Sequence, residues 1–167
     1  MIAITKINED LLHEVRDIAL KTWPKTFAHI LSPDQIDYML DWMYHLDALR
    51  SQLFEKNHVF LLAEENSKYL GFASYVVNHE ETNKTKIHKI YILPETQGKG
   101  VGKKLLQAVS EIALLNGDTH LFLNVNKYNQ KAIDFYSHLG FYEAAQEVID
   151  IGNGFVMDDV VMELKLT

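Results

Sequence analysis

Gln97-Gly98-Lys99-Gly100-Val101-Gly102 is the stretch of sequence from which the fold of this chain can be inferred. An apolar, strand-like run over residues 87–93 precedes it, and a helix-like run over residues 101–115 follows it. Three alternating glycines at a strand-to-helix junction let several backbone N–H groups converge on one point, and the helix dipole adds partial positive charge there. The stretch therefore predicts a phosphate-binding loop.

The spacing of the glycines separates this loop from the two common nucleotide-binding motifs. A P-loop requires GxxxxGK[ST], but the position five residues after Gly98 is Lys103, and no Ser or Thr follows Lys103 or Lys104. A dinucleotide fingerprint requires GxGxxG, and its third glycine position is again Lys103. The pattern that remains is Gln-x-x-Gly-x-Gly. The alternative to a phosphate-binding loop is a glycine-rich turn with a good helix start.

A second informative stretch is NQKAIDFYSHLGF, residues 129–141. It matches the pattern Asn-x-x-Ala-x-x-Phe-Tyr-x-x-x-Gly-Phe at every specified position. With the glycine loop and the order of the predicted elements, this stretch resembles the GNAT superfamily, the acyl-CoA-dependent N-acyltransferases. The resemblance covers roughly residue 57 to the C-terminus, and the N-terminal helices fit the family only in topology.

Periodicity and turn signals predict the order of the elements along the chain. A helix after Asn8 is expected to end at Trp23-Pro24, because the residue before a proline is pushed out of the helical region. A second helix begins at Ser32-Pro33, and Asp47 caps a further helical turn that runs through Leu53 and Phe54. The remaining predicted elements are a strand at 2–6, strands at 59–63, 69–77 and 86–93, a helix at 101–115, a strand at 121–125, a helix at 130–138, and a hairpin of strands at 141–151 and 156–166.

These elements predict an α/β (α+β) fold with a GNAT-like mixed, mostly antiparallel central sheet of about six to seven strands, flanked by about four helices. The chain has 167 residues, of which 47% are apolar and 23% charged, and we expect one N-acetyltransferase domain over residues 1–167. The sequence has no cysteine, which excludes disulfides, thiolate metal sites and a cysteine nucleophile. The eight histidines are scattered without metal-ligand spacing, so we expect no metal.

The net charge of −7 argues against nonspecific nucleic-acid binding. The N-terminus lacks the apolar core of a signal peptide, and no apolar run approaches 20 residues, so neither export nor membrane insertion is expected. A cytoplasmic protein is the default expectation. Exposed strands in the C-terminal hairpin would permit a homodimer.

The resemblance implies acetyl-CoA as co-substrate and assigns residues to it. The backbone of Ile90, Tyr91 and Ile92 would pair with the pantetheine arm, and the loop that begins at Gln97 would cradle the pyrophosphate. Asn129 would bind or position the pantetheine, although it also suits a helix N-cap, and Lys131 would lie near the ribose phosphate. The loop residues in this set are Gln97, Gly98, Lys99, Gly100, Val101, Gly102 and Lys103. The side chains of Lys103 and Lys104 are expected to form the solvated face of the following helix.

The same resemblance assigns two catalytic roles. Tyr136 would protonate the leaving thiolate, and its alternative is a core aromatic residue at helical spacing with Ala132 and Leu139. The attacking amine must be neutral, and some family members place a histidine or glutamate base on the strand that corresponds to residues 86–93. His88 is therefore the leading base, with a histidine of no catalytic role as its alternative. His79, Glu80 and Glu81 in the preceding loop are further candidates, and a water path is another.

The acceptor is expected to be a small-molecule amine, such as a polyamine. In this family it usually enters between the N-terminal helices and the last hairpin. Aromatic rings and carboxylates can hold a cation, although core packing and solvent exposure explain the same residues. The segment resembles bacterial polyamine acetyltransferases in general character, with the dipeptide Thr26-Phe27 and an aromatic-rich helix. A protein or peptide N-acetyltransferase and a non-catalytic acyl-CoA-binding module stay open. The aromatic and acidic residues of the N-terminal helices that could hold a cationic acceptor are Trp23, Phe27, Asp34, Asp37, Tyr38, Asp41, Trp42, Tyr44 and Asp47.

Overall fold

The computed structural model describes all residues from Met1 to Thr167, which form seven strands and five α-helices. The contacts divide the chain into two compact units. The first unit comprises Met1–Val76 and His88–Glu111, and the second comprises Val77–Ile87 and Ile112–Thr167. Strand β4 (Lys84–Ile92) and helix α4 (Val101–Leu115) each contribute residues to both units.

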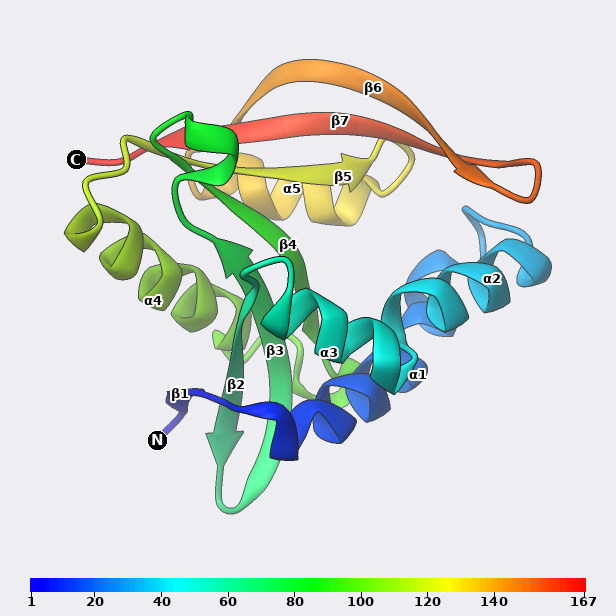
Figure 1. Ribbon diagram of the computed structural model, residues 1–167, viewed down its shortest axis with the longest axis horizontal. Helices are drawn as coiled ribbons and strands as arrows, with labels where there is room; N and C mark the ends of the chain where they lie inside the picture. The colour runs from blue at the N-terminus through cyan, green and yellow to red at the C-terminus, as the bar shows by residue number, and fades with distance from the viewer. The chain divides into compact units, whose positions relative to one another are not determined.

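The first unit is an antiparallel meander with three helices on it (Figure 1). Its strands follow the order β1-β2-β3-β4, and Val59 to Leu62 of β2 pair with Tyr75 to Phe72 of β3. Aromatic residues from helices and strands form its core, among them Trp23, Tyr44, Phe60 and Phe72. The elements are β1 (Ala3–Lys6), the 3-10 turn η1 (Glu9–Leu11), α1 (Leu12–Phe27), α2 (Pro33–Tyr44), α3 (Leu46–Phe54), β2 (Val59–Glu65), β3 (Lys68–Val76) and the 3-10 turn η3 (Pro94–Thr96).

Helix α1 continues through Pro24 to Phe27, so the predicted end at Trp23-Pro24 is wrong. The proline cannot donate a hydrogen bond to the carbonyl four residues earlier, that of Leu20. Leu20 is 41% exposed, so this face of the helix is open to water. Trp23 and Phe27 are both buried, with ring centroids 4.6 Å apart, and their burial favours one continuous helix on both sides of the proline.

Helix α3 is the element that raises the number of helices above the predicted four. The predicted helical turn through Leu53 and Phe54 is confirmed, since α3 ends at Phe54, but the predicted cap at Asp47 is wrong: the N-cap is His45, whose Nδ1 accepts a hydrogen bond from the Asp47 N–H over 3.4 Å. Leu49 and Gln52 are buried and fix the helix on the first unit. The sequence signal was weak because histidine is not among the favoured capping residues.

The second unit follows the strand order β4-β5-β7-β6. Lys84 to Ile87 of β4 pair in parallel with His120 to Leu123 of β5, whereas β5, β7 and β6 are antiparallel to their neighbours. Buried Leu121 and Leu123 supply strand side chains to its core, and Tyr136 of α5 is buried as well. The elements are the 3-10 turn η2 (His79–Glu81), β5 (His120–Asn126), α5 (Gln130–His138), β6 (Tyr142–Gly152) and β7 (Phe155–Lys165).

Strand β6 is the last strand of the sheet order and is exposed along residues 142–150. Bulges interrupt its pairing with β7 near both ends, between Glu143 and Ala145 and between Asp150 and Gly152. From Ala145 to Asp150 the ladder is regular. Val148 is 69% exposed, and the strand contains three acidic residues and no basic one.

The predicted fold class is confirmed: the sheet is mixed and mostly antiparallel. The expectation of one domain over residues 1–167 stays a prediction. No helix combines the length and the apolar character that crossing a membrane requires.

Candidate active site

The turn that follows β4 is anchored to strand β3 in the first unit. Leu93 N–H donates to the carbonyl of Leu70 over 2.8 Å. Thr96 Oγ1 donates to the carbonyl of Leu93 over 2.9 Å, and Thr96 is buried. These bonds fix where the glycine loop begins. The sequence analysis did not single out Thr96, because its partners become apparent only when the pairing of β3 and β4 is known.

The glycine loop has the backbone conformation that its sequence predicts. Gly98 and Gly100 have φ angles of 84° and 81°, which lie in the left-handed region that glycine adopts at no steric cost. A Cβ at either position would meet no atom within 4 Å, so these glycines are required by the backbone angle and not by crowding. Residues 97–100 are exposed, and the loop is therefore open to a ligand.

Helix α4 begins directly at this loop. Lys104 N–H donates to the carbonyl of Gly100 over 3.1 Å and forms the first bond of the helix. The N–H groups of Val101, Gly102 and Lys103 therefore precede the first intrahelical donor, which is the arrangement that favours anions at helix N-termini. The chain thus fits a pyrophosphate group here. The side chain of Lys103 is exposed.

Gly71 of β3 brings its strand unusually close to the end of β4. A Cβ built on Gly71 would lie 2.8 Å from the Tyr91 carbonyl oxygen and 2.8 Å from Ile92 Cδ1. The Tyr91 ring packs on the other side against Trp23, 5.6 Å between centroids, and Phe72, 6.0 Å. The backbone of Ile90 to Ile92, predicted to pair with pantetheine, is therefore held by contacts on two sides. The role of Gly71 was not predicted, because an isolated glycine in a strand indicates that another backbone approaches closely but does not show which one.

His88 stands on β4 two residues before Ile90 and is half-buried. Its ring stacks on that of His58, with centroids 4.1 Å apart and an angle of 28° between the planes. The next residue, Lys89, is buried and donates to Gln52 Oε1 over 2.6 Å. Its Nζ also lies over the rings of Tyr44 and Phe60, 5.7 and 5.9 Å from their centroids.

The second unit holds the other predicted residues. Tyr136 is buried between the rings of Phe135 and Phe141, whose centroids lie 5.2 and 5.4 Å from its own. Burial raises the pKa of Tyr136 well above its ordinary value, so the phenol keeps its proton at neutral pH. Asn129 caps α5, since its Oδ1 accepts from the Ala132 N–H over 3.3 Å, and Lys131 is exposed.

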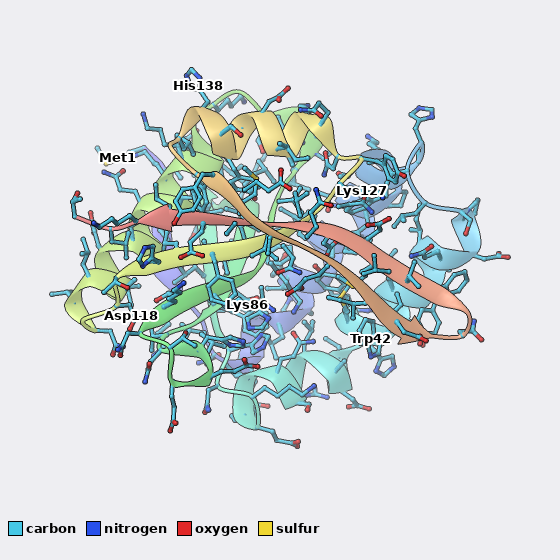
Figure 2. All side chains as sticks on the ribbon, turned by 90° about the horizontal axis from the view of Figure 1, so that it is seen from above. Met1, Trp42, Lys86, Asp118, Lys127 and His138 are labelled. Carbon is cyan, nitrogen blue, oxygen red and sulfur yellow. The ribbon has the colours of Figure 1, made fainter.

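The loop before β4 carries the other candidate bases. Glu80 and Glu81 have φ angles of 51° and 59°, a left-handed conformation that is uncommon for residues other than glycine. The His79 ring packs edge-on against Phe122, and Lys86, labelled in Figure 2, lies over the same ring. Burial and the charge of Lys86 lower the pKa of His79. Asp118 holds the loop by accepting from the Asn78 N–H over 2.8 Å.

The aromatic and acidic residues of the N-terminal helices separate into two groups. Trp23, Phe27 and Tyr44 are buried in the first unit, as core packing predicts. On α2, Trp42 is 48% exposed and its ring stacks on that of Tyr38, 6.3 Å between centroids. The carboxylates are all exposed; they belong to Asp34, Asp37, Asp41 and Asp47. Helix α2 therefore carries one exposed ring, stacked on a half-buried one, together with negative charge.

Known proteins resemble the chain over most of its length. A spermidine N(1)-acetyltransferase from Thermoplasma acidophilum is 26% identical over 161 residues, which cover 94% of this chain and 96% of the relative. The crystal structure of a PaiA N-acetyltransferase from the same organism, in complex with coenzyme A, superposes with a TM-score of 0.79 and 27% identity over 99% of both chains.

Shorter matches connect the chain to further N-acetyltransferases. An uncharacterized N-acetyltransferase from Bacillus subtilis is 30% identical over 98 residues, 57% of this chain. The chain spans 66% of that relative and 39% of an uncharacterized N-acetyltransferase from Methanocaldococcus jannaschii. Residues 12–141 match the Acetyltransferase (GNAT) family, and the chain therefore belongs to this family.

Proposed function

We propose that this chain transfers the acetyl group of acetyl-CoA to a primary amine of a small molecule, and that the acceptor is a polyamine. The observation that carries the acceptor class is the similarity to a spermidine N(1)-acetyltransferase over 94% of this chain. The stacked rings of half-buried Tyr38 and exposed Trp42 beside carboxylates on α2 support it, because such a face attracts a flexible cation.

The donor site that we propose is the one that the family resemblance implies. The N–H groups from Gly98 to Lys103 bind the pyrophosphate, and the backbone from Ile90 to Ile92 binds the pantetheine arm. Asn129 positions the pantetheine and Lys131 lies toward the ribose phosphate. Support comes from the left-handed glycines and from the amides at the start of α4, and the PaiA relative was solved with coenzyme A.

The proposed reaction is direct attack in a ternary complex. The amine nitrogen forms a bond to the thioester carbonyl carbon, and the bond from that carbon to sulfur breaks. His88 accepts the proton that the amine loses, and Tyr136 gives its proton to the departing thiolate sulfur. The Tyr136 phenol carries its proton at neutral pH and can donate it, although burial, which raises its pKa, makes it a weaker acid than an exposed tyrosine.

The deciding experiment measures release of free CoA thiol from acetyl-CoA, with spermidine, spermine, aromatic amines, amino acids and short peptides as acceptors. We expect turnover with the polyamines. Tyr136→Phe should lower kcat by about 100- to 10,000-fold and leave CoA affinity by calorimetry unchanged. Tyr128→Phe is the matched control, because Tyr128 is 66% exposed and has no proposed role.

Three outcomes would overturn parts of the proposal. Turnover with peptides alone would identify a protein or peptide N-acetyltransferase. Tight CoA binding without turnover on any acceptor would indicate a non-catalytic binding module. Equal kcat in Tyr136→Phe and Tyr128→Phe would remove the tyrosine from the chemistry.

A further inference from the structure

His58 lies just before β2 and is set firmly in the first unit. Its backbone N–H donates to the carbonyl of Gln52 over 2.9 Å, at the end of α3. The side chain is buried, with 7% of the residue exposed. Its ring lies 6.2 Å from the Phe60 ring and 4.1 Å from the His88 ring. A residue with a bonded backbone and a buried ring is a rigid support for its neighbours.

The ring of His88 is held by this support on one face. The angle of 28° between the two planes is close to parallel, so the contact is made by ring faces and not by edges. A histidine side chain on a strand can adopt staggered rotamers about χ1 and a broad, roughly two-fold range about χ2. A second ring stacked at 4.1 Å blocks the rotations that would carry the His88 ring through that space.

We propose that His58 is a positioning residue for His88: its ring restricts rotation of the His88 imidazole, the group that accepts the proton of the acceptor amine in the proposed function. The proposal rests on the role of His88 in the proposed function. His58 acts through ring stacking and contacts neither substrate. A proton acceptor must be aligned within hydrogen-bond reach of the proton it removes, and rotational freedom of the ring would reduce the fraction of aligned enzyme.

The first test compares His58→Leu with His58→Phe, using acetyl-CoA and spermidine. Leucine fills the buried site without a ring, whereas phenylalanine keeps a flat ring there. We expect His58→Leu to lower kcat by about 3- to 10-fold, as the loss of one aromatic pair predicts, with KM for spermidine unchanged. His58→Phe should recover most of kcat. His13→Leu is the matched control, since the His13 side chain is 55% exposed.

A double variant separates positioning from a loss of stability. If His58 acts through His88, His58→Leu will cause no further loss of kcat in a His88→Gln background. An equal loss in both backgrounds would mean that His58 supports the fold and not the base, and it would overturn the proposal. The proposal is also overturned if His58→Leu and His13→Leu have the same kcat.

A measurement without turnover makes the proposal independent of the acceptor. Relaxation of the ring carbons in protein labelled with ¹³C at histidine reports the order of the His88 ring. We expect a highly ordered ring in the unsubstituted chain and in His58→Phe, and a clearly lower order parameter in His58→Leu. An unchanged order parameter would overturn the positioning role. Unchanged kcat in His88→Gln would instead overturn His88 as the base, and failure to acetylate spermidine would overturn only the acceptor.

Discussion

The ammonium group of Lys89 lies 2.6 Å from Gln52 Oε1, and both residues are buried in the first unit. Gln52 Nε2 in turn donates to the carbonyl of Met43 over 3.0 Å, in the last turn of α2. One side chain of α3 therefore connects β4 to the C-terminal end of α2. The positive charge of Lys89 is placed where the dipole of that helix is negative, which is a favourable arrangement.

Gln52→Leu should destabilise the chain, because a buried cation loses an acceptor. Removing a hydrogen bond to a charged group costs about 1.5–3 kcal/mol. The double variant Gln52→Leu/Lys89→Met should be less destabilised than the single one, because both polar partners are then gone. Urea denaturation of the two single variants and the double variant measures this coupling. If the change in the free energy of unfolding of the double variant equals the sum of the changes in the two single variants, the two side chains do not stabilise each other.

Gly98→Ala should weaken coenzyme A binding. Alanine at a φ of 84° is strained by about 1–2 kcal/mol, and relief of that strain turns the loop amides away from the ligand. Isothermal titration calorimetry should give about a tenfold higher Kd. Gly154→Ala is the matched control, since Gly154 has a φ of 79° and equally open surroundings but lies in the β6–β7 turn. A similar rise of Kd in both variants would show that the glycine loop is not the binding element.

Gly71→Ala should displace the end of β4. The added methyl group would meet the Tyr91 carbonyl oxygen, and backbone yields less easily than the end of a side chain. Overpacking of this kind costs about 1–3 kcal/mol. Both the thermal midpoint and the affinity for coenzyme A should fall, because Ile90 to Ile92 are the proposed pantetheine strand. Loss of stability with unchanged affinity would separate the strand from the ligand.

Lys86→Met should raise the pKa of His79. Burial lowers this pKa first and the charge of Lys86 lowers it further, so removal of that charge leaves burial opposed only by the charge of Glu80, which raises the pKa. The folded chain binds fewer protons than the unfolded chain between the lowered and the ordinary pKa, and the free energy of unfolding therefore rises with pH across that window. The variant should flatten this rise. Titration of the His79 ring by NMR measures the pKa directly.

Lys84→Met provides the control for that titration. Lys84 bonds Glu163 over 2.7 Å and is not among the groups that shift His79. We expect the His79 titration curve of this variant to overlay that of the unsubstituted chain. A shift of the same size in Lys84→Met and Lys86→Met would mean that net charge, and not the neighbouring ammonium, sets the pKa of His79.

The sequence predicts the elements best where local chemistry alone determines them. The helix over Val101–Leu115 begins after paired glycines and ends before Asn116-Gly117, and its predicted bounds are those of the structure. The helix over Gln130–His138 is equally local, since Asn129 caps it. The resemblance to the GNAT superfamily, built on these two helices and their flanking residues, is confirmed by the family match over residues 12–141.

Features that depend on distant partners were not predicted. Pro24 lies inside α1 because burial of Trp23 and Phe27 outweighs the local break. Gly71 needs the register of β3 and β4 before its closeness to Tyr91 can be seen, and the stacking of His58 on His88 brings together residues from two separated segments. The roles of Tyr136, His88 and the loop residues stay predictions, because they depend on substrates.

The exposed strand β6 has a consequence for the behaviour of concentrated protein. Its free edge could template growth of an ordered aggregate, and Glu143, Glu147 and Asp150 are the charges that oppose this. Two copies that pair antiparallel through this edge about Glu147 place the two Glu147 side chains opposite each other. Electrostatic repulsion between these carboxylates is the barrier here, so acidification or high salt would weaken it. The tendency of this protein to self-associate through β6 thus depends on the pH and ionic strength of its solvent and not on its core.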